Sequence, residues 1–403
     1  MLDWILLILL LIIAFLIIWQ FVGYPFLMAL YSKRKKQIKS DSNFTPFVTI
    51  LVPTFNEERV IERRIDNLNR LEYPKDKYEI IVVDSGSTDN TIPIVEEIIR
   101  GSYSHPKVRI VKEKTRNGKA SAINFGCDFA IGEIILVTDA NCVFDEQVLS
   151  KIIPHFKNPA TGAVGGQFKV LNPEKNPLAA STQFYWDLEY LMRLGETELD
   201  SACLFHGEIN AWRKDIVRAD LKMLSEDLDM VLQIKEKGYK VAYEPEAVVY
   251  EPAPTTIEDQ IKQRKRTSIG TIQCIFKHWR YLIIPGDKYR SLIFPSHKTL
   301  VVLSPFLLMA FILISAILIM LGKATLVLFS AISLVLIFGL LFWGLMRIKR
   351  KLIKNSNENA NRSSISKLLK YVLLNEYLLL LAWRDFLLRR YSVLWEKAES
   401  TRS

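Results

Sequence analysis

Residues 47–91 read FVTILVPTFNEERVIERRIDNLNRLEYPKDKYEIIVVDSGSTDNT, an apolar run, a helical run and a second apolar run in succession. The β-rich run at 47–53 predicts a buried strand, and apolar residues at helical spacing follow it. The run at 78–83 is the next predicted strand, and 88–100 is the helix after it. Strand and helix alternating at this spacing predict right-handed βαβ units and a largely parallel sheet.

The alternation continues beyond this stretch and then becomes less regular. Further strands are predicted at 108–112, 133–138, 163–170 and 241–250, and further helices at 119–131, 177–198, 226–237 and 255–278. The fold class is therefore α/β with a mostly parallel, mixed sheet. Sites in such sheets form beyond the carboxyl ends of the strands, so the residues after each strand are candidates for function.

Three stretches of this 403-residue chain carry no charged side chain, namely 4–32, 299–321 and 324–346. Each is long enough to cross a hydrocarbon core of about 30 Å as a helix. A cleaved signal peptide needs a basic start and a short apolar run, whereas the start of this chain carries the acidic Asp3 and its apolar run is long. We therefore expect a retained anchor, and a tight hairpin at Gly322 and Lys323 between the last two spans.

Basic residues at the ends of these stretches predict the orientation. They lie at 33–39, before the second stretch at 288–298, and after the third at 347–354. By the positive-inside rule the amino terminus lies outside and residues 33–298 are cytoplasmic, which predicts a multi-pass protein of the cell membrane. The net charge of +10 also suggests nucleic acid, but anionic lipid headgroups already explain the clusters, so we expect no nucleic-acid partner.

The same patterns divide the chain into segments. We expect an anchor at 1–32, a basic juxtamembrane segment at 33–46, an α/β domain at 47–254, an amphipathic segment at 255–298, a membrane hairpin at 299–346, and a basic linker with a last helix at 347–403. That helix, at 368–388, carries charges along its length and basic residues at both ends, so we expect it to lie in the membrane interface. The four cysteines form no CxxC pair, which fits a reduced compartment.

Four polar clusters follow predicted strands or open a helix. They are Pro53–Glu58, Asp84–Asp89, Asp139–Asn141 and Ser225–Leu228. Each alone has a structural explanation, because Asp, Ser, Gly and Thr are typical of turns and helix N-caps. Taken together, and in this order along the chain, the four clusters indicate a functional site rather than four unrelated turns.

The ordered set resembles the family 2 inverting glycosyltransferases with a GT-A fold, which include cellulose, chitin and hyaluronan synthases. The matching motifs are PTFNEE at 53–58, VVDSGSTDNT at 82–91, RNGKASAINFG at 116–126, TDAN at 138–141, SEDLDM at 225–230 and QRKR at 263–266. The resemblance covers about residues 47–270. It implies a nucleotide-sugar donor, usually carrying uridine, a divalent cation and inversion at the anomeric carbon.

The resemblance also assigns roles to single residues. The catalytic residues that it implies are Asp227 and Glu226. Asp227 matches the base that takes the proton of the acceptor hydroxyl, and such general base catalysis typically raises the rate by about 10²–10⁴. The donor contacts that it implies are Thr54, Glu57, Asp84, Arg116, Lys119, Asp139, Gln263 and Arg266. Asp84 and Glu57 would contact the base or ribose. Arg116 and Lys119 would face the uracil or the phosphates, or else be solvated surface charges.

A divalent cation, Mg²⁺ or Mn²⁺, prefers oxygen ligands that it shares with phosphate oxygens. Asp139 is the expected metal ligand. The family usually has a second acid two residues later, where this chain has Asn141, whose amide oxygen supplies less charge.

The QRKR motif allows two interpretations. Gln263 and Arg266 share one face of a helix, so Arg266 can fork onto a diphosphate. The basic residues beside apolar ones would also make a membrane-surface helix. The motif of polymerising members ends in Trp, where this chain has Thr267, which argues against processive synthesis.

We therefore expect a membrane glycosyltransferase that acts on a lipid-linked or saccharide acceptor at the cytoplasmic bilayer face. The alternatives are a processive polysaccharide synthase coupled to export, a nucleotidyltransferase on a similar sheet, and a non-catalytic membrane scaffold with a degenerate transferase domain. Asn141 and Thr267 favour the scaffold, whereas the motifs at 225–228 and 263–266 argue against a nucleotidyltransferase.

Overall fold

The computed structural model describes residues 2–34, 43–101, 106–171, 179–252, 256–284, 286–352 and 365–393. The chain divides into two compact units. The membrane unit consists of Met1–Lys35, Ala180–Asp200 and Trp279–Leu387, and the sheet unit of Lys36–Ala179, Ser201–His278 and Leu388–Ser403. Most of the basic cluster at 33–39, and residues 353–364 of the basic linker expected within 347–403, lie outside the described residues.

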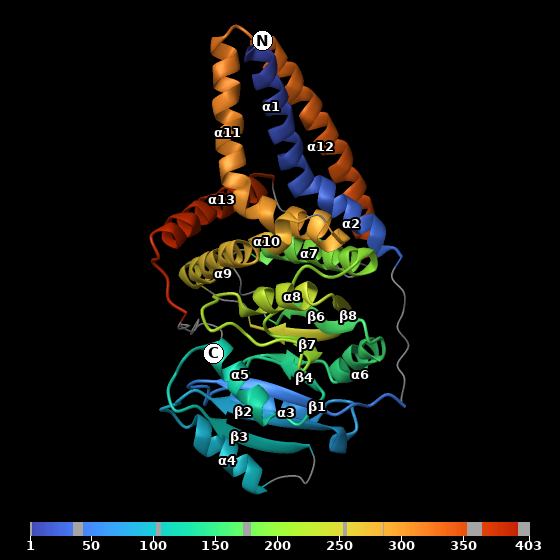
Figure 1. Cartoon of the computed structure of the whole chain (residues 1–403), viewed down its shortest axis with the longest axis vertical. Coiled ribbons are helices and arrows are strands. Elements are labelled where there is room, and N and C mark those ends of the chain that lie inside the picture. The colour runs from blue at the N-terminus through green and yellow to red at the C-terminus, as the bar shows by residue number, and fades with distance from the viewer. Residues whose placement is uncertain are drawn as a thin grey trace. The chain divides into compact units, whose positions relative to one another are not determined.

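The sheet unit is built on one eight-stranded sheet with the order β3-β2-β1-β4-β7-β6-β8-β5 (Figure 1). The strands are β1 (Val48–Thr54), β2 (Tyr78–Asp84), β3 (Lys107–Lys112), β4 (Ile134–Val137), β5 (Val143–Phe144), β6 (Thr161–Val170), β7 (Asn210–Arg213) and β8 (Lys240–Glu251). Neighbours from β3 to β4 run parallel, as β6 and β8 do, while β7 and β5 pair antiparallel with their neighbours. The predicted α/β class with a mixed sheet is confirmed.

The central strands form because their apolar side chains are buried on both faces. Every residue of β2, and six of seven in β1, are buried. The helices of this unit are α3 (Ile61–Asn69), α4 (Thr91–Gly101), α5 (Lys119–Phe129), α6 (Val148–Ile152), α8 (Glu226–Glu236) and α9 (Ile257–Lys277). Gly126 lets α5 approach the sheet, since a Cβ there would lie 2.8 Å from Val83 and 3.0 Å from Leu51.

In the sheet unit, the strands β5 and β7 and the short helix α6 were not predicted from the sequence. β7 has only four residues, too few for a periodic pattern, yet it lies between β4 and β6 and so joins the two parallel parts of the sheet. β5 has two residues and pairs with β8 at the far edge. The other predicted strands match the observed ones within two residues at either end.

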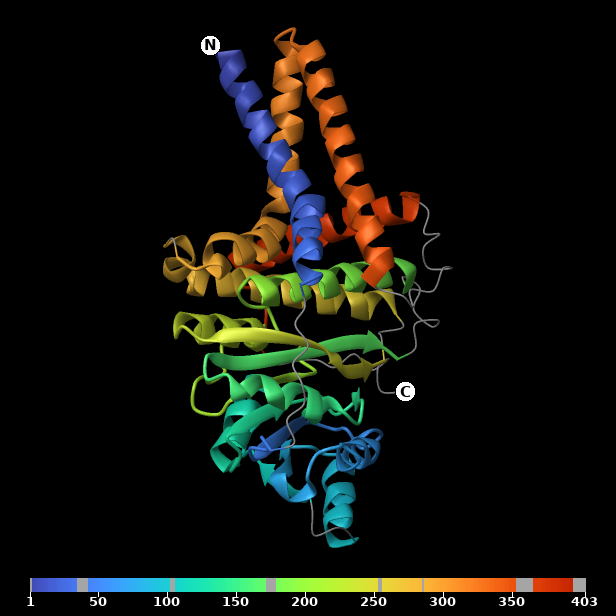
Figure 2. The same ribbon diagram turned by 90° about the vertical axis from the view of Figure 1, so that its right-hand side faces the viewer.

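Among its described residues, the membrane unit contains three helices that are long and apolar enough to cross a membrane, judged by length and composition. They are Leu2–Ser32, which comprises α1 (Leu2–Ile18) and α2 (Tyr24–Ser32), then Tyr289–Met320, which ends in α11 (Leu300–Met320), and α12 (Ala324–Leu352). The hairpin turns at Gly322, whose φ of +74° suits glycine. Figure 2 shows α1, α11 and α12 side by side and α13 (Ile365–Leu387) running across them.

Buried polar contacts place α7 (Ala179–Leu199) in the membrane unit. His297 lies between two carboxylates of this helix, with its Nδ1 2.6 Å from Glu196 and its Nε2 3.0 Å from Glu189. The Tyr24 hydroxyl donates to Glu196 over 2.6 Å, and Arg193 forms an ion pair with Glu189. α7 interrupts the chain between β6 and β7, so a segment inside the predicted domain at 47–254 packs with the membrane helices.

Candidate active site

The ends of β1 and β2 form the floor of the site. The two strands run in parallel register up to Thr54 and Asp84, so their carboxyl ends coincide. The buried Asp84 carboxylate accepts hydrogen bonds from the backbone amides of Gly86 (3.0 Å) and Ser87 (3.2 Å). Asp84 therefore shapes the turn after β2.

The loops after β1 and β2 are tied to each other. The Glu57 amide donates to the Thr91 hydroxyl over 2.7 Å, and the Glu58 amide donates to Asp89 over 3.1 Å. Asn56, in the left-handed region with φ of 54°, accepts from the Thr88 amide. Because every link joins one polar cluster to the other, the motifs at 53–58 and 84–91 form one rigid wall.

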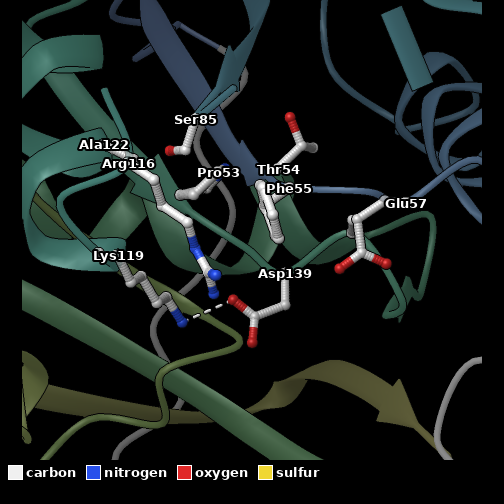
Figure 3. A pocket seen from close by; sticks show the side chains of 11 residues that line it. Pro53, Thr54, Phe55, Glu57, Ser85, Arg116, Lys119, Ala122 and Asp139 are labelled. Atoms are coloured by element: carbon white, nitrogen blue, oxygen red, sulfur yellow. Dashed lines mark ion pairs between the residues drawn. The ribbon is translucent and has the colours of Figure 1, made fainter. Parts of the chain in front are cut away.

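A pocket opens above these strand ends (Figure 3). Its lining residues are Pro53, Thr54, Phe55, Glu57, Ser85, Arg116, Gly118, Lys119, Ala122, Asp139 and Ala140. Figure 3 shows Arg116, Lys119 and Asp139 pointing into the same space. The Arg116 guanidinium lies 4.0 Å from the centre of the Phe55 ring, a cation–π contact. One pocket is therefore lined by five of the predicted donor residues, namely Thr54, Glu57, Arg116, Lys119 and Asp139. Asp84, another predicted donor residue, does not line the pocket but directly precedes Ser85, which does.

Lys119, the first residue of α5, links the pocket to the predicted catalytic motif. Its Nζ lies 2.6 Å from Asp139 and 3.9 Å from Glu226, and donates to the Gly207 carbonyl oxygen over 3.1 Å. Burial alone would lower the pKa of Lys119, but the carboxylates of Asp139 and Glu226 outweigh it and raise the pKa above its usual value. Lys119, whose side chain is 10% exposed, is therefore a largely enclosed ammonium group rather than a solvated surface charge.

Residues 138–142 leave β4 and reach β5, which pairs with a different part of the sheet. Arg64 of α3 clamps this crossing segment, donating from Nη1 to the Cys142 carbonyl oxygen (3.2 Å) and from Nη2 to the Thr138 hydroxyl. Its guanidinium also lies 4.2 Å from the centre of the Phe144 ring. Burial lowers the pKa of Arg64 to about 10, so it stays charged at neutral pH.

The crossing segment brings Asp139 beside two carboxylates that the sequence analysis did not select. Ligand oxygens of Asp139, Glu208 and Glu251 lie within 4.8 Å of one another. Burial, with the nearby carboxylates of Glu251 and Asp139, raises the pKa of Glu208 to about 8. Three hard oxygen donors crowded in this way fit a divalent cation, which would relieve their repulsion.

Asn141, the second predicted metal ligand, is fully buried, and its Nδ2 donates to Glu251 over 3.0 Å. Glu251 ends β8, so it stands at the carboxyl end of a predicted strand, and that position was a detectable signal. Glu208 precedes the short β7, which the sequence did not reveal. The neighbouring His206 ring lies 5.4 Å from the Phe168 ring, and we give it no role in chemistry.

The catalytic motif opens α8. Glu226 is buried, and burial raises its pKa in spite of the opposing charge of Lys119. Asp227 is partly exposed, and one of its oxygens accepts from the Leu228 amide over 2.8 Å. Asp227 is thus more exposed than Glu226 and Asp229, the other two carboxylates of this motif, and its role as base remains a prediction.

The QRKR motif lies on α9. Arg266 donates from Nη2 to the Leu224 carbonyl oxygen over 3.2 Å, directly before the catalytic motif. Gln263 is exposed, and its carbonyl oxygen accepts from the Thr267 hydroxyl over 3.0 Å. Arg266 is therefore next to the site, and the donor contacts of Gln263 and Arg266 remain predictions.

A fold of this kind, with polar clusters at the carboxyl ends of β1, β2 and β4, is that of the GT-A glycosyltransferases. The structure is similar to that of the mannosyltransferase PcManGT from Pyrobaculum calidifontis, solved with GDP-Man and Mn²⁺, with a TM-score of 0.62 and 26% sequence identity. The match covers 86% of this chain and 100% of that one. Residues 49–219 match the model of glycosyl transferase family 2, so the chain contains a domain of this family.

Curated relatives agree with this assignment. The chain is 30% identical over 243 residues to a probable glycosyltransferase, YdaM, of Bacillus subtilis, covering 58% of this chain and 57% of the relative. It is 26% identical over 266 residues to the beta-monoglucosyldiacylglycerol synthase of a Nostoc species (65% and 57% covered). It is 27% identical over 264 residues to a poly-beta-1,6-N-acetyl-D-glucosamine synthase of Staphylococcus epidermidis (64% and 63% covered). The chain spans less than two thirds of the length of these relatives.

Proposed function

We propose that this chain is a membrane-bound, inverting glycosyltransferase that moves a sugar from a nucleoside-diphosphate donor to an acceptor hydroxyl. The observation that carries the proposal is the position of Lys119, whose ammonium group contacts both Asp139 of the pocket and Glu226 of the catalytic motif. This contact supports a common site for the predicted donor residues and the motif that carries the candidate base, Asp227. A decayed scaffold would have no reason to retain a buried cation between these carboxylates.

The reaction follows from the charges around this point. Asp227 takes the proton of the acceptor hydroxyl while that oxygen bonds to the anomeric carbon. The bond from this carbon to the diphosphate breaks on the opposite face, which inverts the configuration. Arg116 and Lys119 offer positive charge to the departing nucleoside diphosphate, the electrostatic help that such a leaving group needs.

A divalent cation, Mg²⁺ or Mn²⁺, belongs to this proposal. Asp139, Glu208 and Glu251 would hold it, and Asn141 would orient Glu251 through its amide. When bound, the cation neutralises diphosphate charge. The mannosyltransferase of similar structure was solved with Mn²⁺, which supports this part of the proposal.

The donor that we expect is a uridine-linked sugar, as the family resemblance implies. GDP-mannose is the competing donor, because the structurally similar mannosyltransferase was solved with it. We place the sheet unit in the cytoplasm on the evidence of the basic residues that flank the spans. A lipid-linked acceptor is supported by the relative named as a diacylglycerol glycolipid synthase.

A second candidate function is processive synthesis of a polysaccharide. The relatives named poly-beta-1,6-N-acetyl-D-glucosamine synthase favour it. Thr267, exposed on α9, argues against it because the polymerising members carry Trp there. Product length separates the two candidates, since a synthase makes long polymer and a transferase adds a single sugar.

The test is a donor screen on membranes that contain the full chain, with UDP-sugars and GDP-mannose, with and without a lipid extract. We expect release of uridine diphosphate that depends on the extract, stops on chelation and returns with Mn²⁺ or Mg²⁺. The configuration of the product, read by NMR, tests inversion. Release of pyrophosphate would instead mean a nucleotidyltransferase, and no turnover with any donor would contradict the proposal.

A further inference from the structure

The segment that leads into the catalytic motif is fastened along one face of α9. The Leu224 amide donates to the Gln273 side chain over 3.0 Å, and its carbonyl oxygen accepts from Arg266 over 3.2 Å. At Gly270 the two segments are so close that a Cβ would lie 2.2 Å from the Ser225 hydroxyl. The start of α8 therefore cannot shift without α9.

A buried charge cluster continues this attachment one turn into α8. Asp229 is fully buried, and its Oδ1 lies 2.8 Å from His278 Nε2 and 2.7 Å from Lys277 Nζ. Its other oxygen accepts from Gln233 over 2.7 Å. A buried carboxylate needs such donors, because an unpaired buried charge is costly.

His278 completes the cluster with both ring nitrogens. Nδ1 lies 2.7 Å from Glu236, at the end of α8, and Nε2 contacts Asp229. Carboxylates only accept hydrogen bonds, so the ring donates from both nitrogens and is charged. Burial alone would lower the pKa of His278, but the hydrogen bonds to Asp229 and Glu236 outweigh it and raise the pKa. Lys277 also forms an ion pair with Asp220 over 2.7 Å.

We propose that Asp229 is a positioning residue, which with His278 and Lys277 locks α8 to α9 and so fixes Asp227 relative to Arg266. Asp227 and Asp229 lie on one helix, separated by a single residue, so a tilt at Asp229 moves the base. The donor pocket lies on other elements, the strand ends of β1, β2 and β4 and the start of α5. Loss of the lock should therefore reduce turnover and leave donor binding intact.

This inference rests on the proposed function, and full-length protein in detergent or nanodiscs is the material for its test. For Asp229→Asn and for His278→Gln we expect kcat for nucleoside diphosphate release to fall about 10–100-fold. The donor KM and the stoichiometry of nucleotide binding should stay within about threefold of wild type. The control, Asp128→Asn, changes an exposed carboxylate on α5 and should leave kcat within twofold.

The double variant separates positioning from simple damage. If both residues act through one lock, Asp229→Asn combined with His278→Gln should be no slower than the slower single variant, whereas independent effects would multiply. In the pH profile of kcat, the pH at which kcat changes on the alkaline side should also shift in His278→Gln, because the variant has no charged ring at this position. Multiplied losses, or a fall in nucleotide stoichiometry that matches the fall in kcat, would overturn the inference. An inactive wild type would instead overturn the proposed function.

Discussion

The two sides of this site are held in place by different means. On the donor side, parallel strands end in register and backbone amides bind the carboxylates that follow, as in Asp84 with Gly86 and Ser87. On the catalytic side, α8 is held by side chains far away in the sequence, as in Asp229 with His278. The comparison teaches that mutations on the two sides should have different effects, and four experiments measure turnover, cation requirement or stability after a change on one side.

The largest effect is expected at the base. Asp227→Asn keeps the shape of the side chain but cannot take a proton, so we expect turnover to fall by about 10²–10⁴. Nucleotide binding, measured by calorimetry, should be unchanged because the donor side is untouched. Asp215→Asn, at an exposed position before α8, is the control. Wild-type turnover in Asp227→Asn would show that another group is the base.

The second largest effect is expected on the cation requirement, at the proposed cation site on the donor side. Glu251→Gln removes one of three clustered carboxylates, and we expect the Mn²⁺ concentration that supports half-maximal turnover to rise at least about tenfold. Glu246→Gln, on the same strand but exposed and paired with Lys151, should leave it unchanged. Equal Mn²⁺ requirements in both variants would exclude Glu251 as a ligand.

A smaller effect is expected from the clamp on the crossing segment. Arg64→Lys loses the forked hydrogen bonds to Thr138 and Cys142, and we expect about 2–4 kcal/mol of stability to be lost in chemical denaturation. Arg63→Lys, its exposed neighbour, should change stability by no more than about 0.5 kcal/mol. If the two variants lose the same free energy of unfolding, the hydrogen bonds of Arg64 contribute little to the stability of the donor side.

The smallest effect is a pH dependence of the catalytic side. The pKa of His278 is raised in the folded protein, so its stabilisation is fully present below its unfolded pKa of about 6.5 and is lost as the pH rises through the folded value. At pH 6 we expect His278→Gln to lower Tm by about 3–6 °C relative to wild type. Scanning calorimetry at pH 9.5 should show a smaller difference in Tm between the variant and wild type. A difference in Tm that grows with pH would mean that the His278 ring is neutral.

The donor side could be predicted from the sequence because its determinants are local. The clusters at 53–58, 84–89 and 139–141 each follow a strand with a clear apolar pattern, and parallel strands bring such clusters to one edge, so Thr54, Glu57 and Asp139 line one pocket. Arg116 and Lys119, which the family resemblance implied, line it too, and the donor contacts of all five residues remain predictions. The fold class was predictable for the same reason. The unusually short β7 was not, and with it the sheet order and the position of Glu208 were missed.

The remaining contacts depend on tertiary packing. Asn141 contacts Glu251 because the segment after β4 crosses to β5, which pairs with β8. No spacing in the sequence encodes that crossing. The lock between Asp229 and His278 joins residues 49 positions apart. Likewise, α7 lies inside the predicted α/β domain by sequence, yet His297 binds it from a distant helix.

The state of the cysteines has a practical consequence. All four are free and buried, and burial raises the pKa of Cys127 to about 12 and those of Cys142 and Cys274 well above their usual value. Thiolates are the reactive form, so the folded chain should be nearly silent toward maleimides. A single added cysteine then reports its own surroundings: on intact cells an impermeant reagent should label Lys323→Cys in the hairpin and spare Glu97→Cys on α4.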